Sequence, residues 1–172
     1  MRTYNPAFDL YHSIFRMAHI AAKLEDGESL DVDKVRIWDF YLLFPDKVYN
    51  IHLHHDEEKI KEYRNTIKRQ NNPYDYHGDN RKLFEWIKPV QVSALSCLVS
   101  CGILNKEKFE GGYVCVGNRQ VLSSFLQKAG TITPREHNVL AFMSYLSRAM
   151  SMTGISGLKA RTELLDFKYD AE

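Results

Sequence analysis

Apolar residues recur at steps of three and four through residues 6–24, a spacing that predicts an amphipathic helix. Asn5 and Pro6 favour a helix start at this point. Asn caps the free amides of a first turn, and Pro at the first helical position lacks only an N–H that would have no partner. A polar stretch around Gly27 ends the helix.

A second helix is expected to begin at Ser29 or Asp31 and to run to about residue 44. Its far end is apolar on nearly all sides, so we expect that end in the core. Pro45 stops the helix, because a proline ring clashes with the preceding helical turn.

Polar and charged residues dominate the middle of the chain. Residues 48–53 read as a short extended connection, and residues 56–70 carry a narrow apolar seam that suits a surface helix. Residues 71–80 are rich in Asn, Asp, Pro and Gly, which predicts a long loop between structural units.

The following segments have the order of a winged helix. Residues 83–87 predict a short helix that Pro89 interrupts, and residues 90–101 predict an uncharged helix. Residues 103–116, with a turn at residues 110–112, predict a β-hairpin. Helix, helix and hairpin succeed one another in a winged helix-turn-helix.

Three further helices are predicted, at about residues 121–128, 134–152 and 158–167. Thr133 and Glu136 form a capping box at the start of the second.

The predicted class is therefore mainly α with a minor β part. It consists of a winged-helix-like core, a β-hairpin wing and additional C-terminal helices. We expect residues 1–118 to form the winged-helix-like domain, with a loop near residues 71–80, and residues 119–172 to form a helical region packed on it.

Composition sets the broad class of the protein. The 172 residues include 23 Lys+Arg, 22 Asp+Glu and 44% hydrophobic residues, as in one compact domain or two very small ones. No apolar run approaches the roughly 18 residues of a membrane span, and the start lacks the apolar run of a signal peptide. We expect a cytoplasmic protein that does not enter a membrane.

Charge is uneven along this nearly neutral chain. Residues 1–50 hold six basic and eight acidic side chains, whereas residues 119–161 hold six basic and one acidic. Such a basic region is a candidate contact for DNA or for an acidic partner. Its residues are Arg119, Lys128, Arg135, Arg148, Lys159 and Arg161.

Metal ligation and thiol chemistry have weak support in the sequence. His52, His54, His55 and Asp56 are the densest group of candidate ligands, but no other His or Cys pair has a matching spacing. We expect a solvated helix entry there and no metal site. The three cysteines are too few for a disulfide framework, and their apolar surroundings favour reduced packing thiols.

Known catalytic motifs are missing from the sequence. It has no GxxxxGK[ST], GxGxxG or GxSxG pattern and no histidine beside a nucleophile in a readable motif. We expect no enzymatic activity, no cofactor and no small-molecule substrate. The predicted recognition helix, residues 90–101, offers Gln91 and serines but no charged side chain, so it suits packing on a protein better than reading bases.

The start of the chain carries more aromatic surface than one short helix can bury, which predicts a protein interface. The candidate residues of this interface are Phe8, Tyr11, Phe15 and Arg16.

Two segments carry a resemblance to a known family. They read Tyr4-Asn-Pro-Ala-Phe-Asp-Leu-Tyr-His-Ser-Ile-Phe-Arg16 and Trp38-Asp-Phe-Tyr-Leu-Leu-Phe-Pro45, and the apolar helix and hairpin follow them. The chain resembles the small middle components of bacterial ABC three-component defence systems, a class that includes Lamassu-like systems. The resemblance implies a subunit that bridges a large SMC-like ABC ATPase and an effector, without catalytic residues. Its most recognisable positions here are Asp9, Tyr11, His12, Arg16, Asp39, Phe44 and Pro45.

Residues and resemblance together predict a non-catalytic accessory subunit of an antiphage or anti-plasmid complex. Its partners would be an SMC-like ABC ATPase and an effector, and contact with DNA stays open. The alternative is a winged-helix DNA-binding transcriptional regulator, which the basic region favours. A third hypothesis, a metal-dependent nuclease or hydrolase, would use His52, His54 and His55.

Overall fold

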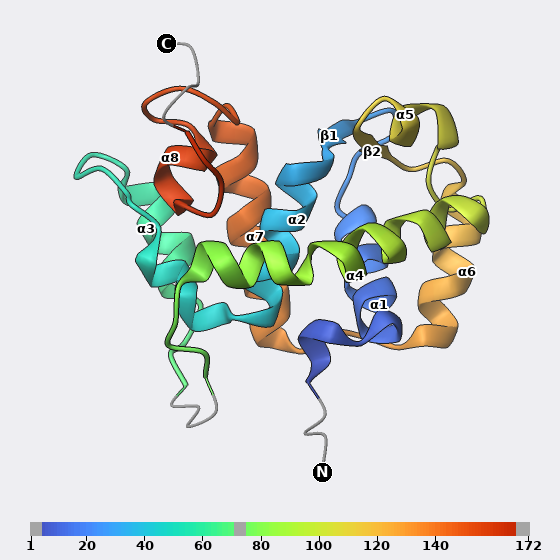
Figure 1. The fold of residues 1–172 in the computed structure, drawn as a ribbon, viewed down its shortest axis with the longest axis horizontal. Coiled ribbons are helices and arrows are strands. Elements are labelled where there is room, and N and C mark those ends of the chain that lie inside the picture. Colours follow the sequence, from blue (N-terminus) through green and yellow to red (C-terminus); the bar gives the residue numbers. More distant parts are fainter. Residues whose placement is uncertain (1–4, 71–74, 168–172) are drawn as a thin grey trace. The chain divides into compact units, whose positions relative to one another are not determined.

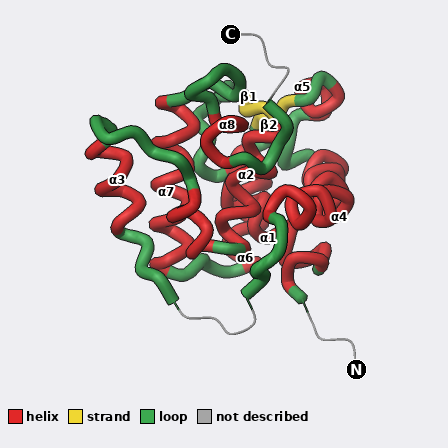
Figure 2. The backbone as a smooth tube through the Cα atoms, turned by 60° about the vertical axis from the view of Figure 1, so that its left-hand side comes forward, coloured by secondary structure: helices red, strands yellow, loops and turns green. Residues whose placement is uncertain are grey.

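Helices dominate the computed structural model, which describes residues 5–70 and 75–167 (Figure 1). Two short strands form the sheet of this described part, as Figure 2 shows. The mainly α class is thereby confirmed, while residues 71–74 of the predicted loop lie outside the described residues. The elements are the 3-10 turn η1 (Pro6–Phe8), α1 (Leu10–Ala21), β1 (Ser29–Asp31), α2 (Val32–Leu43), the 3-10 turn η2 (Pro45–Asn50), α3 (Glu58–Asn65), α4 (Asn80–Ser100), α5 (Lys106–Glu110), β2 (Tyr113–Cys115), α6 (Arg119–Ala129), α7 (Pro134–Ala149) and α8 (Leu158–Thr162).

The chain divides into two units that are interleaved in the sequence. Unit 1 comprises residues 1–39 and 86–132, and unit 2 comprises residues 40–85 and 133–172. The division falls inside α2 and α4, so each unit contains part of both helices. It differs from the predicted single boundary at residue 118, because α6 packs on α1 and belongs to unit 1.

Asp9 splits the predicted first helix into η1 and α1. Asn5 caps η1 as expected, its side chain accepting a hydrogen bond from the amide of Ala7. Asp9 then adopts an extended backbone conformation, and its carboxylate accepts a hydrogen bond from the amide of His12 at 2.9 Å. This second side-chain cap starts α1 at Leu10.

The two strands are far apart in the sequence. β1 pairs antiparallel with β2, and Leu30 lies opposite Val114. Both of these side chains are buried, so the strand pair contributes to the core of unit 1. The second strand of the predicted hairpin therefore exists at β2, and its partner is β1.

Helix α5 occupies the place of the first predicted hairpin strand. One antiparallel bridge, between Leu104 and Val116, joins this region to the residue after β2. Asn105 explains the difference, because its side chain accepts a hydrogen bond from the amide of Lys108 at 2.9 Å and caps a helical turn. The comparison with a winged helix stays a prediction.

α4 is one helix where the sequence predicted two, with Pro89 inside it. An internal proline removes a backbone hydrogen bond and crowds the preceding turn, at a cost of about 3 kcal/mol. Phe84 and Ile87 before the proline and Leu95 after it are fully buried. Each such side chain contributes about 1.5–3 kcal/mol, so burial on both sides offsets the proline and the helix continues. No helix of the described part is long and apolar enough to cross a membrane.

Unit 2 is built on the packing of α3 against α7, which lie side by side in Figures 1 and 2. Tyr63 and Tyr145 stack between them, with ring centroids 4.8 Å apart. The predicted capping box is confirmed at the start of α7. The Thr133 hydroxyl accepts a hydrogen bond from the amide of Glu136, and the Glu136 carboxylate accepts one from the amide of Thr133.

α3 and α8 are shorter than the sequence predicted. After α3 the chain turns back, and the hydroxyl of Tyr49 donates a hydrogen bond to the carbonyl of Ile67 at 2.9 Å. α8 stops at Glu163, whose φ of 55° is left-handed and cannot continue a right-handed helix.

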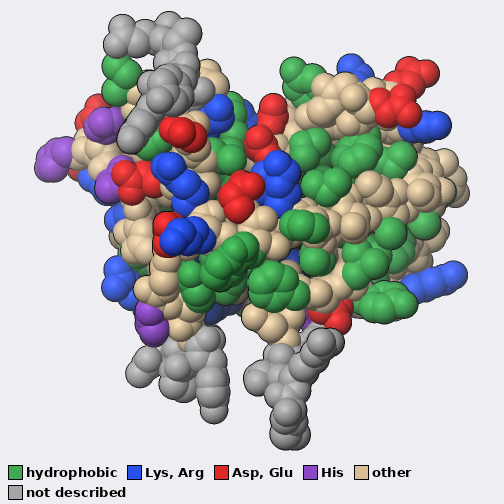
Figure 3. Space-filling model, viewed as in Figure 1, with side chains coloured by type: hydrophobic (Ala, Val, Ile, Leu, Met, Phe, Trp, Pro, Cys, Tyr) green, Lys and Arg blue, Asp and Glu red, His purple; other side chains and the backbone are tan. Residues whose placement is uncertain are grey.

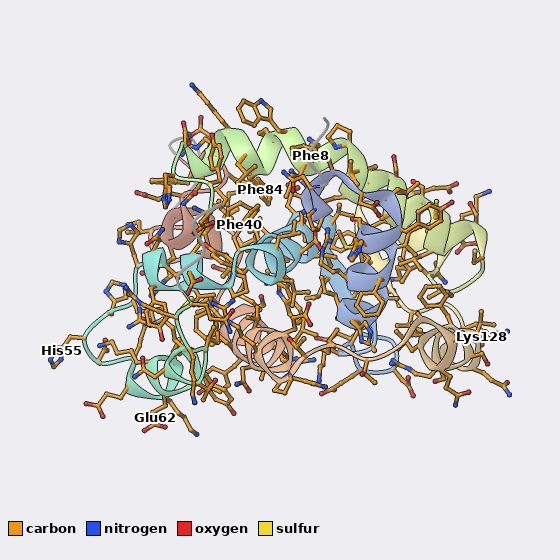
Figure 4. All side chains as sticks on the ribbon, turned by 90° about the horizontal axis from the view of Figure 1, so that it is seen from below. Phe8, Phe40, His55, Glu62, Phe84 and Lys128 are labelled. Carbon is orange, nitrogen blue, oxygen red and sulfur yellow. The ribbon has the colours of Figure 1, made fainter. Side chains whose placement is uncertain are left out.

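Aromatic residues fill the core of unit 2. Phe40 is fully buried, and its ring centroid lies 5.9 Å from that of Phe84 and 5.1 Å from that of Phe44. Phe40 and Phe84 lie close together in Figure 4. The far end of the second helix is thus in the core, as its pattern predicted.

Candidate functional site

An open apolar groove lies on unit 1 between α1, the C-terminal half of α4 and α6. Its volume is about 610 Å³. Figure 3 shows hydrophobic side chains gathered over the C-terminal half of α4 and beside α6. Apolar surface that forms a concave site open to solvent is typical of a binding site. Its walls include Tyr11 and Phe15 of α1, Cys97 of α4 with Cys101 just after it, and Val121 and Phe125 of α6.

A chain of contacts holds the α1 wall against α6. The ring of Phe15 packs edge-on against His19, with centroids 4.5 Å apart. Nε2 of His19 lies 3.1 Å from the carbonyl oxygen of Gly130, which caps α6. The contact of His19 with Gly130 therefore joins α1 to the end of α6, and the contact of Phe15 with His19 orients the two rings within α1.

A buried polar network ties α1 and α4 to α2. The carboxylate of Asp39 accepts hydrogen bonds from Nε of Arg16 at 2.6 Å and from Nε2 of Gln91 at 2.9 Å. Oε1 of Gln91 accepts from Nε of Arg36 at 3.0 Å, and Nη1 of Arg36 donates to Asp33 at 2.7 Å. Arg16, Arg36, Asp39 and Gln91 are each at most 5% exposed. Each buried guanidinium has an anionic partner, since Arg16 binds the completely buried Asp39 and Arg36 binds Asp33, whose side chain is 40% exposed.

The structure separates the four predicted interface residues. Tyr11, at 82% exposure, and the half-buried Phe15 line the groove, while Phe8 is 47% exposed and lies outside the groove lining. Arg16 needs a correction, because it is 5% exposed and its guanidinium binds Asp39. Its partner is 23 residues away in the sequence, so the helical stripe alone did not reveal the pairing.

Arg119, Arg135 and Arg161, three of the six predicted basic contacts, form ion pairs inside the protein. Arg119 binds Asp26 at 2.9 Å and donates to the carbonyl of Leu24 at 2.7 Å. Arg135 binds Asp46 at 2.9 Å. Since these guanidinium groups have intramolecular partners, the charge that they offer to DNA is smaller than the sequence suggested.

Arg161 is the third engaged residue and needs a correction, because it is buried at 5% exposure. It donates to the carboxylate of Glu57 at 2.7 Å, to the carbonyl of Ser156 at 2.7 Å and to the carbonyl of His52 at 3.1 Å. Desolvation raises the pKa of Glu57, but the hydrogen bond from Arg161, the bond from the amide of His54 and the nearby positive charge outweigh it. The pKa of Glu57 therefore lies below its ordinary value.

The other three basic residues have different surroundings. Lys128 is exposed and lines the groove, and Figure 4 shows it at the edge of unit 1 on α6. Arg148 donates to the hydroxyl of Ser144, and Lys159 is half-buried. Lys128 is thus the predicted basic residue that the structure brings together with Tyr11 and Phe15.

The histidine cluster does not form a ligand set in the structure. His52, His54, His55 and Asp56 are all exposed, and Figure 4 shows His55 at the edge of unit 2. Nε2 of His52 lies 3.5 Å from the carboxylate of Glu163. Within residues 5–70 and 75–167, no group of three or more His, Cys, Asp or Glu is placed to hold a metal ion.

The cysteines are free thiols with unequal exposure. Cys115 is buried at 7% exposure, which fits the predicted packing role. Cys97 is half-buried and Cys101 is exposed, and both line the groove. The exposure of Cys101 differs from the prediction because α4 ends at Ser100.

Sequence reasoning missed the groove as a whole. Val121 and Phe125 lie on a predicted helix, but the pattern did not show that they face α1 and α4. The uncharged helix that carries Gln91 was the available signal, since an apolar helix with one amide indicates burial on another part of the protein.

A model of a known protein family matches residues 2–170 of the chain. The matching model describes Middle Component 5 of the ABC-three component (ABC-3C) systems. The chain belongs to this family. No curated protein and no solved structure matches it. Membership confirms the ABC three-component part of the resemblance, so this ABC-3C middle component works within a system of several proteins.

Proposed function

We propose that this middle component is a non-catalytic accessory subunit that bridges an SMC-like ABC ATPase and an effector, in a Lamassu-like defence complex against phages or plasmids. The family match over residues 2–170 carries the proposal, because a middle component of a multi-component system has protein partners. The non-catalytic role is supported by the sequence, which places no nucleophile beside a base in a readable motif.

The groove on unit 1 supports a docking role. Tyr11 is 82% exposed and Val121 is 38% exposed, so burying them against a partner would remove apolar surface from water. The contacts of Phe15 with His19 and of Arg16 with Asp39 hold α1 in place before a partner binds. A pre-organised site spends less free energy on ordering when it binds.

Reconstitution of the system tests the bridging role. The ATPase and the effector are co-expressed with and without this chain and are separated by size-exclusion chromatography with mass detection. We expect the three proteins to co-elute, and the ATPase and effector to separate when the chain is left out. Co-elution of the other two without this chain, or elution of this chain alone from the full mixture, would refute bridging.

The alternative, a DNA-binding regulator, has weaker support. Arg119, Arg135 and Arg161 have intramolecular partners, and the uncharged half of α4 contributes a wall to the apolar groove. Salt-dependent and sequence-selective binding of a DNA duplex by the isolated chain would favour the regulator.

A further inference from the structure

We infer that the groove between α1, α4 and α6 binds an amphipathic helix that carries carboxylates beside its apolar face, supplied by one of the other two components of the system. This inference rests on the proposed function and adds the chemistry of the partner segment. It draws on three observations: the apolar lining, the helical walls and the presence of one lysine in a lining without carboxylates.

The lining is mostly apolar. Ile14, Leu98 and Phe125 are among its residues, and its polar groups are Ser124, Lys128, the hydroxyl of Tyr11 and two thiols. A site of this composition gains free energy from burying apolar anchors and offers few hydrogen bonds. It therefore suits a segment whose own backbone hydrogen bonds are already made, which is the property of a helix.

The shape of the groove also favours a helix. α1 and α6 both line the groove and pack on each other, and His19 of α1 contacts the carbonyl of Gly130 at the end of α6. A volume of about 610 Å³ is large enough for several anchoring side chains. An amphipathic helix presents such anchors at steps of three and four residues along one face.

The charge of the groove walls indicates which side chains should lie beside the apolar face of the bound helix. α1, residues 90–105 and α6 contain no Asp or Glu, while they contain Arg16, Arg119 and Lys128. Arg16 and Arg119 are paired with carboxylates of other elements, and Lys128 lies in the lining itself. A partner with carboxylates beside its apolar face gains an ion pair with Lys128 and meets no like charge from the walls.

The same charge argues against a second copy of this chain as the occupant. A two-fold pairing places one surface patch on the identical patch of the partner. Here the lining would meet an identical lining, which contains Lys128 and no carboxylate to pair with it. Nucleic acid is disfavoured as an occupant as well. Its phosphates need several cations and its base edges need polar side chains, and the lining offers one lysine.

Native thiols make the groove directly testable. Cys101 is exposed in the lining, whereas Cys115 is buried in the same unit. The full chain is treated with a maleimide alone and after mixing with the purified ATPase and effector, and labelled peptides are quantified by mass spectrometry. We expect Cys101 to react rapidly in the free chain and to be protected in the complex, while Cys115 reacts slowly in both.

Matched charge reversals test the carboxylate flanks. Lys128→Glu should weaken the complex about tenfold and reduce the loss of affinity with added salt. Lys88→Glu makes the same charge change on an exposed position of unit 1 outside the lining, and it should leave affinity unchanged. Lys128→Arg should retain binding, and both glutamate variants should keep the wild-type unfolding curve, which rules out loss of folding as the cause.

The outcomes separate this inference from the proposed function. A complex that forms with Cys101 unprotected and with Lys128→Glu neutral overturns the inference and leaves bridging intact. Protection of Cys101 by raising the concentration of this chain alone assigns the groove to a second copy, and protection by duplex DNA assigns it to nucleic acid. Protection by a second copy or by DNA therefore also overturns the inference. Failure to form any complex refutes the proposed function itself, and the inference with it.

Discussion

The two units use buried arginine in different ways. In unit 1, the buried Arg16 and Arg36 bind Asp39, Gln91 and the partly exposed Asp33, so side chains satisfy side chains across three helices. In unit 2, Arg161 meets one glutamate and two backbone carbonyls, so it mainly holds loops. A buried network between side chains loses several hydrogen bonds when one member is removed, because the members are coupled. Unit 1, which carries the apolar groove, is therefore the unit in which a single substitution should lower stability most.

The largest loss of stability is expected from Asp39→Ala, which removes a central member of the side-chain network of unit 1. Asp39 is completely buried and holds both Arg16 and Gln91. Its removal leaves a buried guanidinium without a counter-charge, a defect that costs about 3–5 kcal/mol. Urea unfolding followed by circular dichroism measures the loss.

A paired replacement is the control for this result. Arg16→Met with Asp39→Leu removes both charges and should recover much of the lost stability, since apolar residues can replace a buried ion pair. An Asp39→Ala protein as stable as the wild type would contradict the role of the network.

The next largest loss of stability is expected from Glu57→Gln, which breaks the ion pair of Glu57 with Arg161 in unit 2. The change removes the anionic partner of Arg161 and should cost about 1.5–3 kcal/mol at neutral pH. The pKa of Glu57 is lower in the folded state than its ordinary value of 4.5. Its stabilisation is therefore complete above that value and is lost as the pH falls through the folded pKa.

Unfolding curves over a range of acidic pH check this sign. The difference in stability between the wild type and Glu57→Gln should be constant at higher pH and should shrink below 4.5. A difference that grows on acidification would show that the assigned direction is wrong.

A smaller effect is expected from Thr133→Ala, again in unit 2. The change removes the side-chain acceptor for the amide of Glu136 at the start of α7. Loss of such a cap costs about 1 kcal/mol. Thr133→Ser keeps the hydroxyl and should stay close to the wild-type midpoint in thermal unfolding.

The smallest effect on stability is expected from Tyr11→Ser on the groove of unit 1. Tyr11 is 82% exposed, so its replacement should change the free energy of unfolding by less than about 0.5 kcal/mol. Affinity for the partner should nevertheless fall. A stability loss as large as that of Asp39→Ala would place Tyr11 in the fold and remove it from the interface.

Local signals in the sequence predicted much of the fold. Thr133 with Glu136, Pro45 after an apolar helix and Asn5 before Pro6 each act within one helical turn, and each is found as predicted. Pro89 shows the limit of such signals, because burial on both sides of it decided that α4 continues.

Long-range pairing could not be predicted in this way. The strand before α2 pairs with β2 more than eighty residues later, and no local pattern at Leu30 indicates Val114 as its partner. The groove also depends on contacts between segments that are far apart in the sequence. Tyr11 and Phe15 were predicted as interface residues, but the apolar wall at Val121 and Phe125 depends on how α6 packs on α1.

The interleaving of the two units has a consequence for synthesis on the ribosome. Unit 1 needs residues 1–39 and 86–132, so its first part must wait until about ninety more residues have been added. At 5–20 residues per second this delay lasts roughly 5–20 s. During that time the nascent chain holds α1 without the complete α6, and for about the first half of it Asp39 also lacks Gln91. An early stop or a pause in translation before residue 132 would therefore leave the apolar stripe of α1 exposed to chaperones and proteases.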